Sequence, residues 1–368
     1  MRWVEEFRDP RAIRALADAL AAATTRPWTI MEVCGGQTHT IVRWSLPDLL
    51  PPAIELIHGP GCPVCVTPIA AVDQARALAL RGDVTLATFG DMVRVPGSAG
   101  DLLSARAEGA DVRVVSSPLD ALALARARRD RTLVMFAVGF ETTAPATAAA
   151  IELAAREGLD NFAVLAAHVR VPPAAAMILG DPARRVQGLL AAGHVCAVVG
   201  TEEYPALCER FAAPIVVTGF EPVDLLAGLL ACVRQLEAGR AELEIQYRRA
   251  VRPEGNPAAR AAIARVFAVA DAPWRGLGVV AGGGLRIRDA LARFDAARRF
   301  DLAPLAAAAA AEDARCRASA VLRGLLRPPQ CPEFAAGCTP ERPLGAPMVS
   351  SEGACAAYYR YARRHESA

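Results

Sequence analysis

The stretch Leu133–Ala166 reads LVMFAVGFETTAPATAAAIELAAREGLDNFAVLA, and it decides the fold. It begins with an apolar run, Leu133–Val138, and a turn rich in glycine and polar residues follows at Gly139–Thr143. The alanine-rich segment Ala144–Arg156 has helical spacing, and a second apolar run begins at Phe162. Strand, helix and strand in this order predict a βαβ unit with two parallel strands.

The same alternation runs through the first two-thirds of the chain. Eight apolar runs are predicted as strands: Trp28–Val33, Ala53–Ile57, Val84–Phe89, Val112–Val115, Leu133–Val138, Phe162–Ala166, Val195–Val199 and Ile215–Thr218. Helical patterns lie between them at Ala70–Leu80, Asp120–Arg129, Ala144–Arg156 and Ala174–Leu179. This alternation predicts an α/β fold, with two similar doubly wound parallel sheets preferred and one eight-stranded barrel as the alternative.

The arginine-rich stretch Arg126–Arg131 suggests a junction between two domains. We predict a first α/β domain over residues 1–128, a second over 129–228, and a smaller helical and irregular domain over 229–368. The strand signal fades after Leu225, Cys232–Ala250 reads as an amphipathic helix, and the tail from Arg327 is rich in proline, glycine and cysteine. A tail with so little apolar core of its own needs an additional cross-link to be stable, and a metal cluster would provide one.

Composition excludes several classes of protein. The chain has 368 residues and a net charge of +2, which implies neither nucleic-acid nor membrane-surface binding. All 41 basic residues are arginine, so a standard P-loop and a Schiff-base mechanism, which both require lysine, are excluded.

The N-terminal segment Met1–Ala23 mixes charged and apolar residues, as an amphipathic helix does and a secretory signal does not. We therefore expect a cytoplasmic protein. Ten cysteines in such a protein are unlikely to form structural disulfides.

The first cysteine group lies in the tail, and none of its gaps is the short C-x₂-C of a zinc ribbon. Its members are Cys316, Cys331, Cys338 and Cys355. Four thiolates on proline-rich loops suit a [4Fe–4S] cluster, and spacing alone leaves a structural zinc site equally open.

The second group, Cys62-Pro63-Val64-Cys65, directly follows a predicted strand. A helix N-terminus would lower the pKa of such thiols, and we interpret the two cysteines as a redox pair. Metal ligation and a general disulfide reductase are the alternatives.

The third group is the single Cys34, which ends the first predicted strand and precedes Gly35-Gly36-Gln37-Thr38-His39. Two glycines allow a ligand to approach the backbone, and His39 lies about one helical turn from Cys34 and could donate a proton. A buried, inert cysteine is the alternative, but the polar surroundings favour a thiolate ligand or nucleophile.

The remaining cysteines, Cys196, Cys208 and Cys232, lie in apolar patterns and are predicted to be core residues. Further polar residues follow predicted strands and could contact a polar ligand or simply cap helices. They are Glu141, Thr142, Thr143, Glu202, Glu221, His58 and His168, whereas His365 lies in a charged tail and is expected to be solvated.

Several long motifs, in order over essentially the whole chain, closely resemble the HypD family of hydrogenase maturation factors. They are Cys34–His39, Gly59–Cys65, Thr88–Met92 with Arg94–Gly97, Gly139–Pro145, Cys331–Phe334 and Gly345–Cys355. Ala281–Leu285 is more glycine-rich than this resemblance leads us to expect, but it contains no proposed ligand.

The resemblance implies a scaffold that assembles the iron fragment with cyanide and carbon monoxide for [NiFe]-hydrogenase, acting with a HypC-type chaperone and a HypE-type cyanide donor. It implies that Cys34 ligates this iron, that Cys62 and Cys65 are a thiol–disulfide pair, and that the four tail cysteines hold a [4Fe–4S] cluster, which makes the third domain an iron–sulfur domain.

From the three groups we hypothesise an electron route from the cluster through Cys62 and Cys65 to iron at Cys34. We therefore expect a metallocentre assembly factor with redox activity rather than a conventional turnover enzyme. A stand-alone thiol–disulfide oxidoreductase and a zinc-stapled binding protein are the competing functions.

Overall fold

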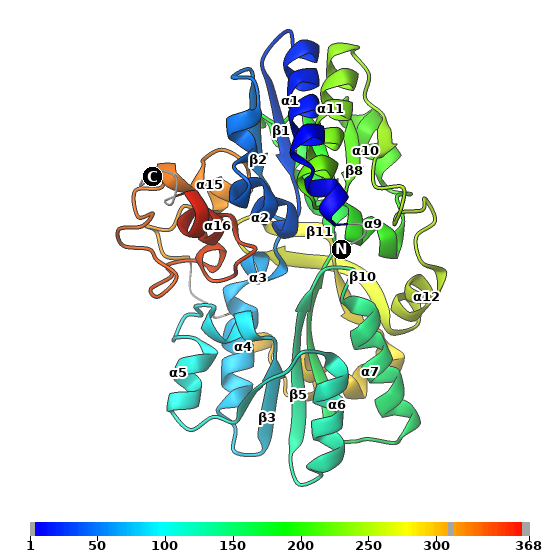
Figure 1. The fold of residues 1–368 in the computed structure, drawn as a ribbon. Helices are drawn as coiled ribbons and strands as arrows, with labels where there is room; N and C mark the ends of the chain where they lie inside the picture. The colour runs from blue at the N-terminus through cyan, green and yellow to red at the C-terminus, as the bar shows by residue number, and fades with distance from the viewer. Residues whose placement is uncertain (1–3, 308–311, 363–368) are drawn as a thin grey trace.

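Two open sheets form the framework of the protein in the computed structural model, which describes residues 4–307 and 312–362 (Figure 1). The first sheet is entirely parallel, in the order β2 (Ile54–His58), β1 (Trp28–Glu32), β7 (Gly188–Ala192), β8 (Ile215–Thr218) and β9 (Leu243–Ile245). The second has the order β10 (Phe267–Trp274), β11 (Gly278–Ile287), β6 (Phe162–Val169), β5 (Thr132–Gly139), β3 (Val84–Thr88) and β4 (Val112–Val114). The barrel alternative is therefore wrong.

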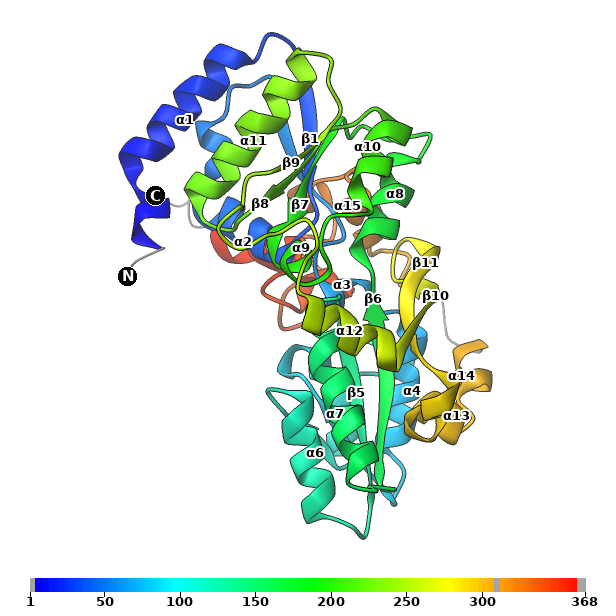
Figure 2. The same cartoon turned by 90° about the vertical axis from the view of Figure 1, so that its right-hand side faces the viewer.

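Helices cover both faces of the first sheet, because its strands are apolar on both sides. One face packs against α1 (Pro10–Ala23), α2 (Gly35–Arg43) and α11 (Pro222–Glu237). The other packs against α8 (Val171–Leu179), α9 (Gly193–Val199) and α10 (Tyr204–Phe211). Figure 2 shows α1 and α11 side by side along this sheet.

The second sheet is covered in the same way. Its faces pack against α6 (Pro118–Ala127), α7 (Ala144–Arg156) and α12 (Pro257–Val266) on one side, and against α4 (Ile69–Ala79), α5 (Leu102–Ala107) and α13 (Ala296–Arg299) on the other. The short helix α14 (Ala303–Ala307) lies on α4. The predicted fold class, two doubly wound α/β sheets, is confirmed.

The sheets do not follow the predicted segments 1–128 and 129–228. The chain leaves the first sheet after β2, builds β3 to β6 of the second, and returns through α8 to β7 and β8. The stretch Arg126–Arg131 is no junction: it links α6 to β5 within the second sheet, and its arginines pair with acidic residues, as in the contact of Arg128 with Asp111.

Two predicted elements differ in type from the structure. Val195–Val199 forms most of α9 and not a strand, because the strand position beside β1 and β8 is taken by the preceding segment, β7. The predicted helix Cys232–Ala250 ends near Gly239, where φ is +63°, and the chain continues into β9. The β7 sequence, GLLAA, lacks β-branched residues, so burial between two strands decides its conformation rather than propensity.

The sequence pattern does not predict the hairpin β10–β11, because the strand signal fades after Leu225. It adds antiparallel strands to the edge of the second sheet, where β11 pairs with β6. Its strands contain Asp271, Pro273 and three consecutive glycines from Gly282, residues that are depleted in strands.

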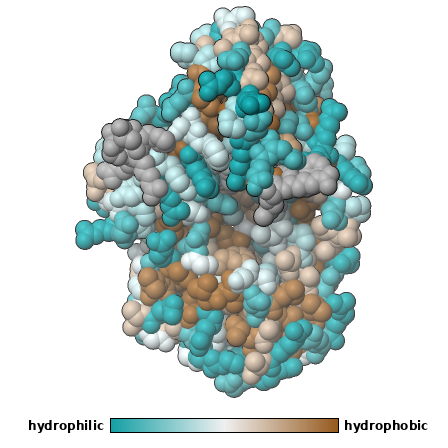
Figure 3. Space-filling view, in the orientation of Figure 1, coloured by the Kyte–Doolittle hydropathy of each residue, from teal (hydrophilic) through white to brown (hydrophobic). Residues whose placement is uncertain are grey.

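The tail folds back to the junction of the two sheets. Its helices are α15 (Ala318–Leu322), the 3-10 turn η6 (Ala346–Met348) and α16 (Ala354–Tyr361). Helix α16 packs on α2, and η6 packs on α3 (Pro63–Val66), as Figure 1 shows in red and blue. Figure 3 shows apolar side chains gathered below this junction and a mostly hydrophilic surface above it. Within residues 4–307 and 312–362, every helix is too short or too polar to cross a membrane.

Candidate functional site

Cys34 lies directly after β1 and immediately precedes α2. Its side chain is 3% exposed, and its backbone N–H donates a hydrogen bond to Glu32 Oε2 at 2.8 Å. Burial raises the pKa of the Cys34 thiol well above its ordinary value, and the nearby Glu32 charge raises it further. A buried thiol of this kind becomes a thiolate most readily when a metal cation replaces its proton.

The turn that carries Cys62 and Cys65 packs directly against Cys34. The Gly35 N–H donates to the Gly61 carbonyl at 2.7 Å. A side chain at Gly61 would overlap the Cys34 backbone, so only glycine permits this approach. The two cysteine turns therefore meet at one place.

Cys62 and Cys65 are paired by the short helix between them. Cys62 precedes α3, and its Sγ accepts the Cys65 N–H at 3.3 Å. Both residues are buried. The expected lowering of thiol pKa is wrong for Cys65, because burial and the neighbouring Cys62 raise its pKa well above the ordinary value.

The four tail cysteines line one small cavity beneath α16. Its walls include Cys316, Cys331, Cys338 and Cys355, with apolar side chains between them. Burial raises the pKa of Cys355, and the other three thiols raise it further because like charges would repel there. Among residues 4–307 and 312–362, no group of three or more His, Cys, Asp or Glu side chains is arranged so that it could hold a metal ion.

Cys355 links this cavity electrostatically to the turn that carries Cys62 and Cys65. A charge on Cys355 is close enough to raise the pKa of Cys65. The tail is held there by hydrogen bonds from Ser350 Oγ to Asp91 Oδ2 at 2.7 Å and from Arg94 to the Val349 carbonyl at 3.3 Å. All three cysteine groups thus lie in one continuous region between the sheets.

His194, and not His39, contacts the Cys34 thiol. The distance from Cys34 Sγ to His194 Nδ1 is 3.7 Å, and burial lowers the pKa of His194 to about 4. The ring of His39 faces the tail instead, with its nitrogens 3.4 Å from the Ser351 carbonyl and 3.3 Å from the Tyr361 hydroxyl. Sequence reasoning missed His194 because reading the following residues as a strand placed it away from a strand end.

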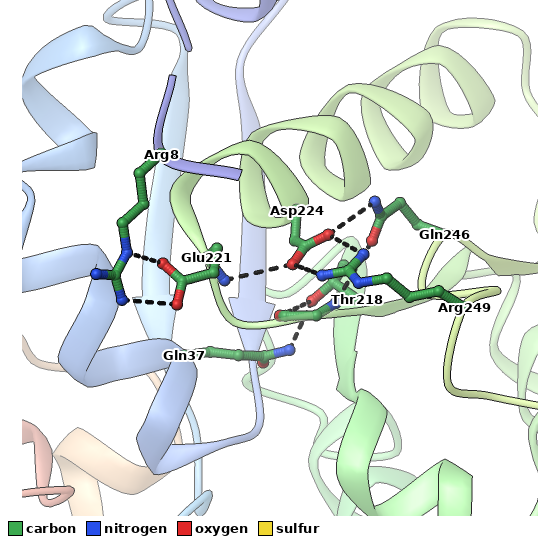
Figure 4. Close-up of polar contacts among 8 residues, drawn as sticks. Arg8, Gln37, Thr218, Glu221, Asp224, Gln246 and Arg249 are labelled. Carbon is green, nitrogen blue, oxygen red and sulfur yellow. Dashed lines mark hydrogen bonds and ion pairs between the residues drawn. The ribbon is translucent and has the colours of Figure 1, made fainter. Parts of the chain in front are cut away.

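Glu221 and its neighbours form a group of polar contacts at the N-terminal end of α11 (Figure 4). Glu221 pairs with Arg8, while the fully buried Asp224 accepts two hydrogen bonds from Arg249. Gln37, from the motif after Cys34, donates to Thr218 Oγ1 at 2.6 Å. Glu221 therefore fixes the N-terminal segment onto α11.

The other predicted polar residues lie at separate positions. His168 donates to or accepts from Thr147 at 3.0 Å, Glu202 pairs with Arg260, and Thr143 packs at the start of α7. His365 lies outside the described residues. Cys196, Cys208 and Cys232 are each at most 1% exposed, which confirms them as core residues.

Glu141 gives a testable pH dependence. One of its oxygens accepts the Val171 N–H at 3.0 Å and the other has no partner, while burial raises its pKa from 4.5 to about 7. The stability linked to this group is fully present below pH 4.5 and is lost as the pH rises through 7, by at most about 3 kcal/mol. Denaturant unfolding should therefore show a smaller loss of stability over this range for Glu141→Gln than for the unaltered protein.

The matched control is Glu202→Gln, which removes an exposed carboxylate whose pKa is lowered by Arg260. It should leave the loss of stability between pH 4.5 and 7 intact. If the free energy of unfolding falls between pH 4.5 and 7 in Glu141→Gln as steeply as in the unaltered protein, Glu141 is not the titrating group.

Together, the fold and the site define an α/β protein in which two buried cysteine turns and a four-cysteine cavity meet between two sheets. The family model HypD, described as "Hydrogenase formation hypA family", matches residues 11–362. The hydrogenase maturation factor HypD of Rhodobacter capsulatus is 49% identical to this chain, with 98% of each chain covered.

Other relatives agree with this match. The proteins of the same name from Azotobacter vinelandii and Escherichia coli strain K12 are 48% and 45% identical and cover all of this chain. The alignments cover 98% and 100% of those relatives. The chain belongs to the HypD family.

Proposed function

We propose that this protein is a hydrogenase maturation factor that carries iron with cyanide and carbon monoxide ligands on Cys34. The observation that carries the proposal is the convergence of three cysteine groups: Gly61 packs on Cys34, α3 with Cys65 packs on η6 of the tail, and a charge on Cys355 acts on Cys65. Family membership supports a role in maturation. A soft thiolate suits iron that is made low-spin by cyanide and carbon monoxide.

The iron fragment is the cargo of the protein and reaches Cys34 from outside. Cys34 supplies one sulfur ligand of the iron, and a partner protein supplies another. We infer that a HypC-type chaperone supplies that ligand and that a HypE-type protein delivers cyanide, both in the cytoplasm.

The four tail cysteines fit a [4Fe–4S] cluster, because four sulfur donors surround one cavity whose remaining walls are mostly apolar, with Arg317 and Glu333 also lining it. Such a cluster would supply single electrons at this point. Cys316, Cys331, Cys338 and Cys355 would hold it, and η6 and α16 would keep it beside α3.

Cys62 and Cys65 can supply two electrons and two protons when their thiols close to a disulfide. The reverse reaction takes up the same two electrons and two protons. Because Cys65 lies within electrostatic range of Cys355 and the turn packs on Cys34, a position between the proposed electron store and the proposed iron ligand fits this pair. A stand-alone reductase is less well supported, because both thiols are at most 3% exposed.

Cys62→Ser and Cys65→Ser test this role. Each should abolish cyanide loading onto iron, measured by infrared spectroscopy after anaerobic incubation with the chaperone and the cyanide donor, while tail iron remains. Serine cannot form the disulfide, so the two-electron step is lost. Cys208→Ser is the matched control and should load cyanide normally. Normal cyanide loading in both Cys62→Ser and Cys65→Ser would refute the redox role.

A further inference from the structure

A buried chain of hydrogen bonds connects α16 to the backbone of Cys34. The Tyr358 hydroxyl lies 3.1 Å from His58 Nε2, and His58 Nδ1 lies 2.6 Å from Glu32 Oε1. The second Glu32 oxygen, Oε2, accepts the Cys34 N–H at 2.8 Å. The chain begins on the helix that carries Cys355 and ends at Cys34 itself.

The direction of these hydrogen bonds follows from their ends. Thr38 Oγ1 donates to Glu32 Oε1 and the Cys34 N–H donates to Glu32 Oε2, so both Glu32 oxygens act as acceptors. His58 Nδ1 then donates to Glu32, and Nε2 pairs with the Tyr358 hydroxyl, accepting its proton in the neutral ring and donating to it in the protonated ring. Burial raises the pKa of Tyr358 to about 12, so its hydroxyl keeps that proton at neutral pH.

Packing alone does not account for this arrangement. Glu32 is 0% exposed and His58 is 4% exposed, and burying such groups costs free energy unless every polar atom is paired. The chain pairs them, but only when α16 is seated, because Tyr358 is the partner of His58 Nε2. The order at Cys34 is therefore linked to the position of the helix that bears Cys355.

We propose that Tyr358, His58 and Glu32 form a positioning relay, through which the seating of α16 fixes the backbone of Cys34. The inference deepens the proposed function and rests on it for the identity of the iron cargo. The three side chains are positioning residues that hold Cys34 in the orientation that receives iron. Because Tyr358 lies on the helix that carries Cys355, they also link the orientation of Cys34 to assembly of the four-cysteine cavity.

Tyr358→Phe tests the relay with the smallest possible change, since it removes one hydroxyl and keeps the ring. The first readout is the backbone amide of Cys34 in the full chain without iron, followed by nuclear magnetic resonance. We expect its resonance to shift and its hydrogen exchange to become about fivefold faster or more, because one hydrogen bond of the chain is lost.

Tyr361→Phe is the matched control on the same helix. It removes a tyrosine hydroxyl that also contacts a histidine, His39, at 3.3 Å, but it leaves the relay intact. The Cys34 amide should be unchanged in this variant. An unaltered Cys34 amide in Tyr358→Phe, or equal effects in both variants, would overturn the relay.

The second readout is the infrared spectrum of the iron-loaded protein. The cyanide and carbon monoxide bands should move or broaden in Tyr358→Phe and stay in place in Tyr361→Phe. Bands that stay in place in both variants would contradict the positioning of Cys34 for its cargo. Missing bands in the unaltered protein would refute the proposed function, whereas the amide measurement would still decide the relay.

Discussion

Cys34→Ala will abolish the infrared bands of iron-bound cyanide and carbon monoxide in protein purified anaerobically with the chaperone. Cys34 lies just after β1, where its thiol contacts His194 and its backbone packs against Gly61. Alanine has no sulfur, so the iron fragment loses its ligand from this chain. The iron of the tail should remain, because that cavity is built from other residues.

Cys196→Ala is the control for this prediction. Cys196 lies in α9, two residues from His194, and is fully buried in the core of the first sheet. Its removal makes the same chemical change nearby and should leave the bands at full intensity. Bands of normal intensity in Cys34→Ala would place the iron on another residue.

Cys338→Ala will remove nearly all tail iron, from about four atoms per chain to almost none. The tail has a small core of its own, centred on Cys338, Met348 and Ala356. Loss of one ligand should therefore also loosen the tail, which a protease assay would detect as faster cleavage after residue 316. Iron and sulfide analysis of anaerobic protein measures the first effect.

Cys208→Ala is the matched control. It removes a buried cysteine of α10 that does not line the four-cysteine cavity. It should retain all iron. A colourless protein with one zinc per chain, in the unaltered protein and the control alike, would instead favour the structural zinc site that cysteine spacing left open.

Most of the fold could be predicted from local pattern. The run Leu133–Val138, its turn and the helix Ala144–Arg156 appear as β5 and α7 almost residue for residue. Their apolar faces have the periods that buried strands and helices require. Connectivity could not be predicted in the same way, because pairing of β1 with β7 joins residues over 150 positions apart, and no local signal encodes it.

The candidate site was predictable where glycine and cysteine occur together. The two glycines after Cys34 indicate a close approach to the backbone, and the structure gives the Gly61 turn as the neighbour. His194 and Tyr358 could not be found in this way, because their roles depend on α9 and on the return of the tail, both tertiary features. A histidine or tyrosine in an apolar segment is far more often a core residue than a functional one.

Mössbauer spectroscopy of anaerobically purified protein with its chaperone tests the central claim most directly. The division of the cysteines by role predicts two iron populations: a cluster signal that requires the tail quartet, and a separate low-spin iron signal that disappears with Cys34. A single population that survives both Cys34→Ala and Cys338→Ala, or a preparation without iron, would contradict the account.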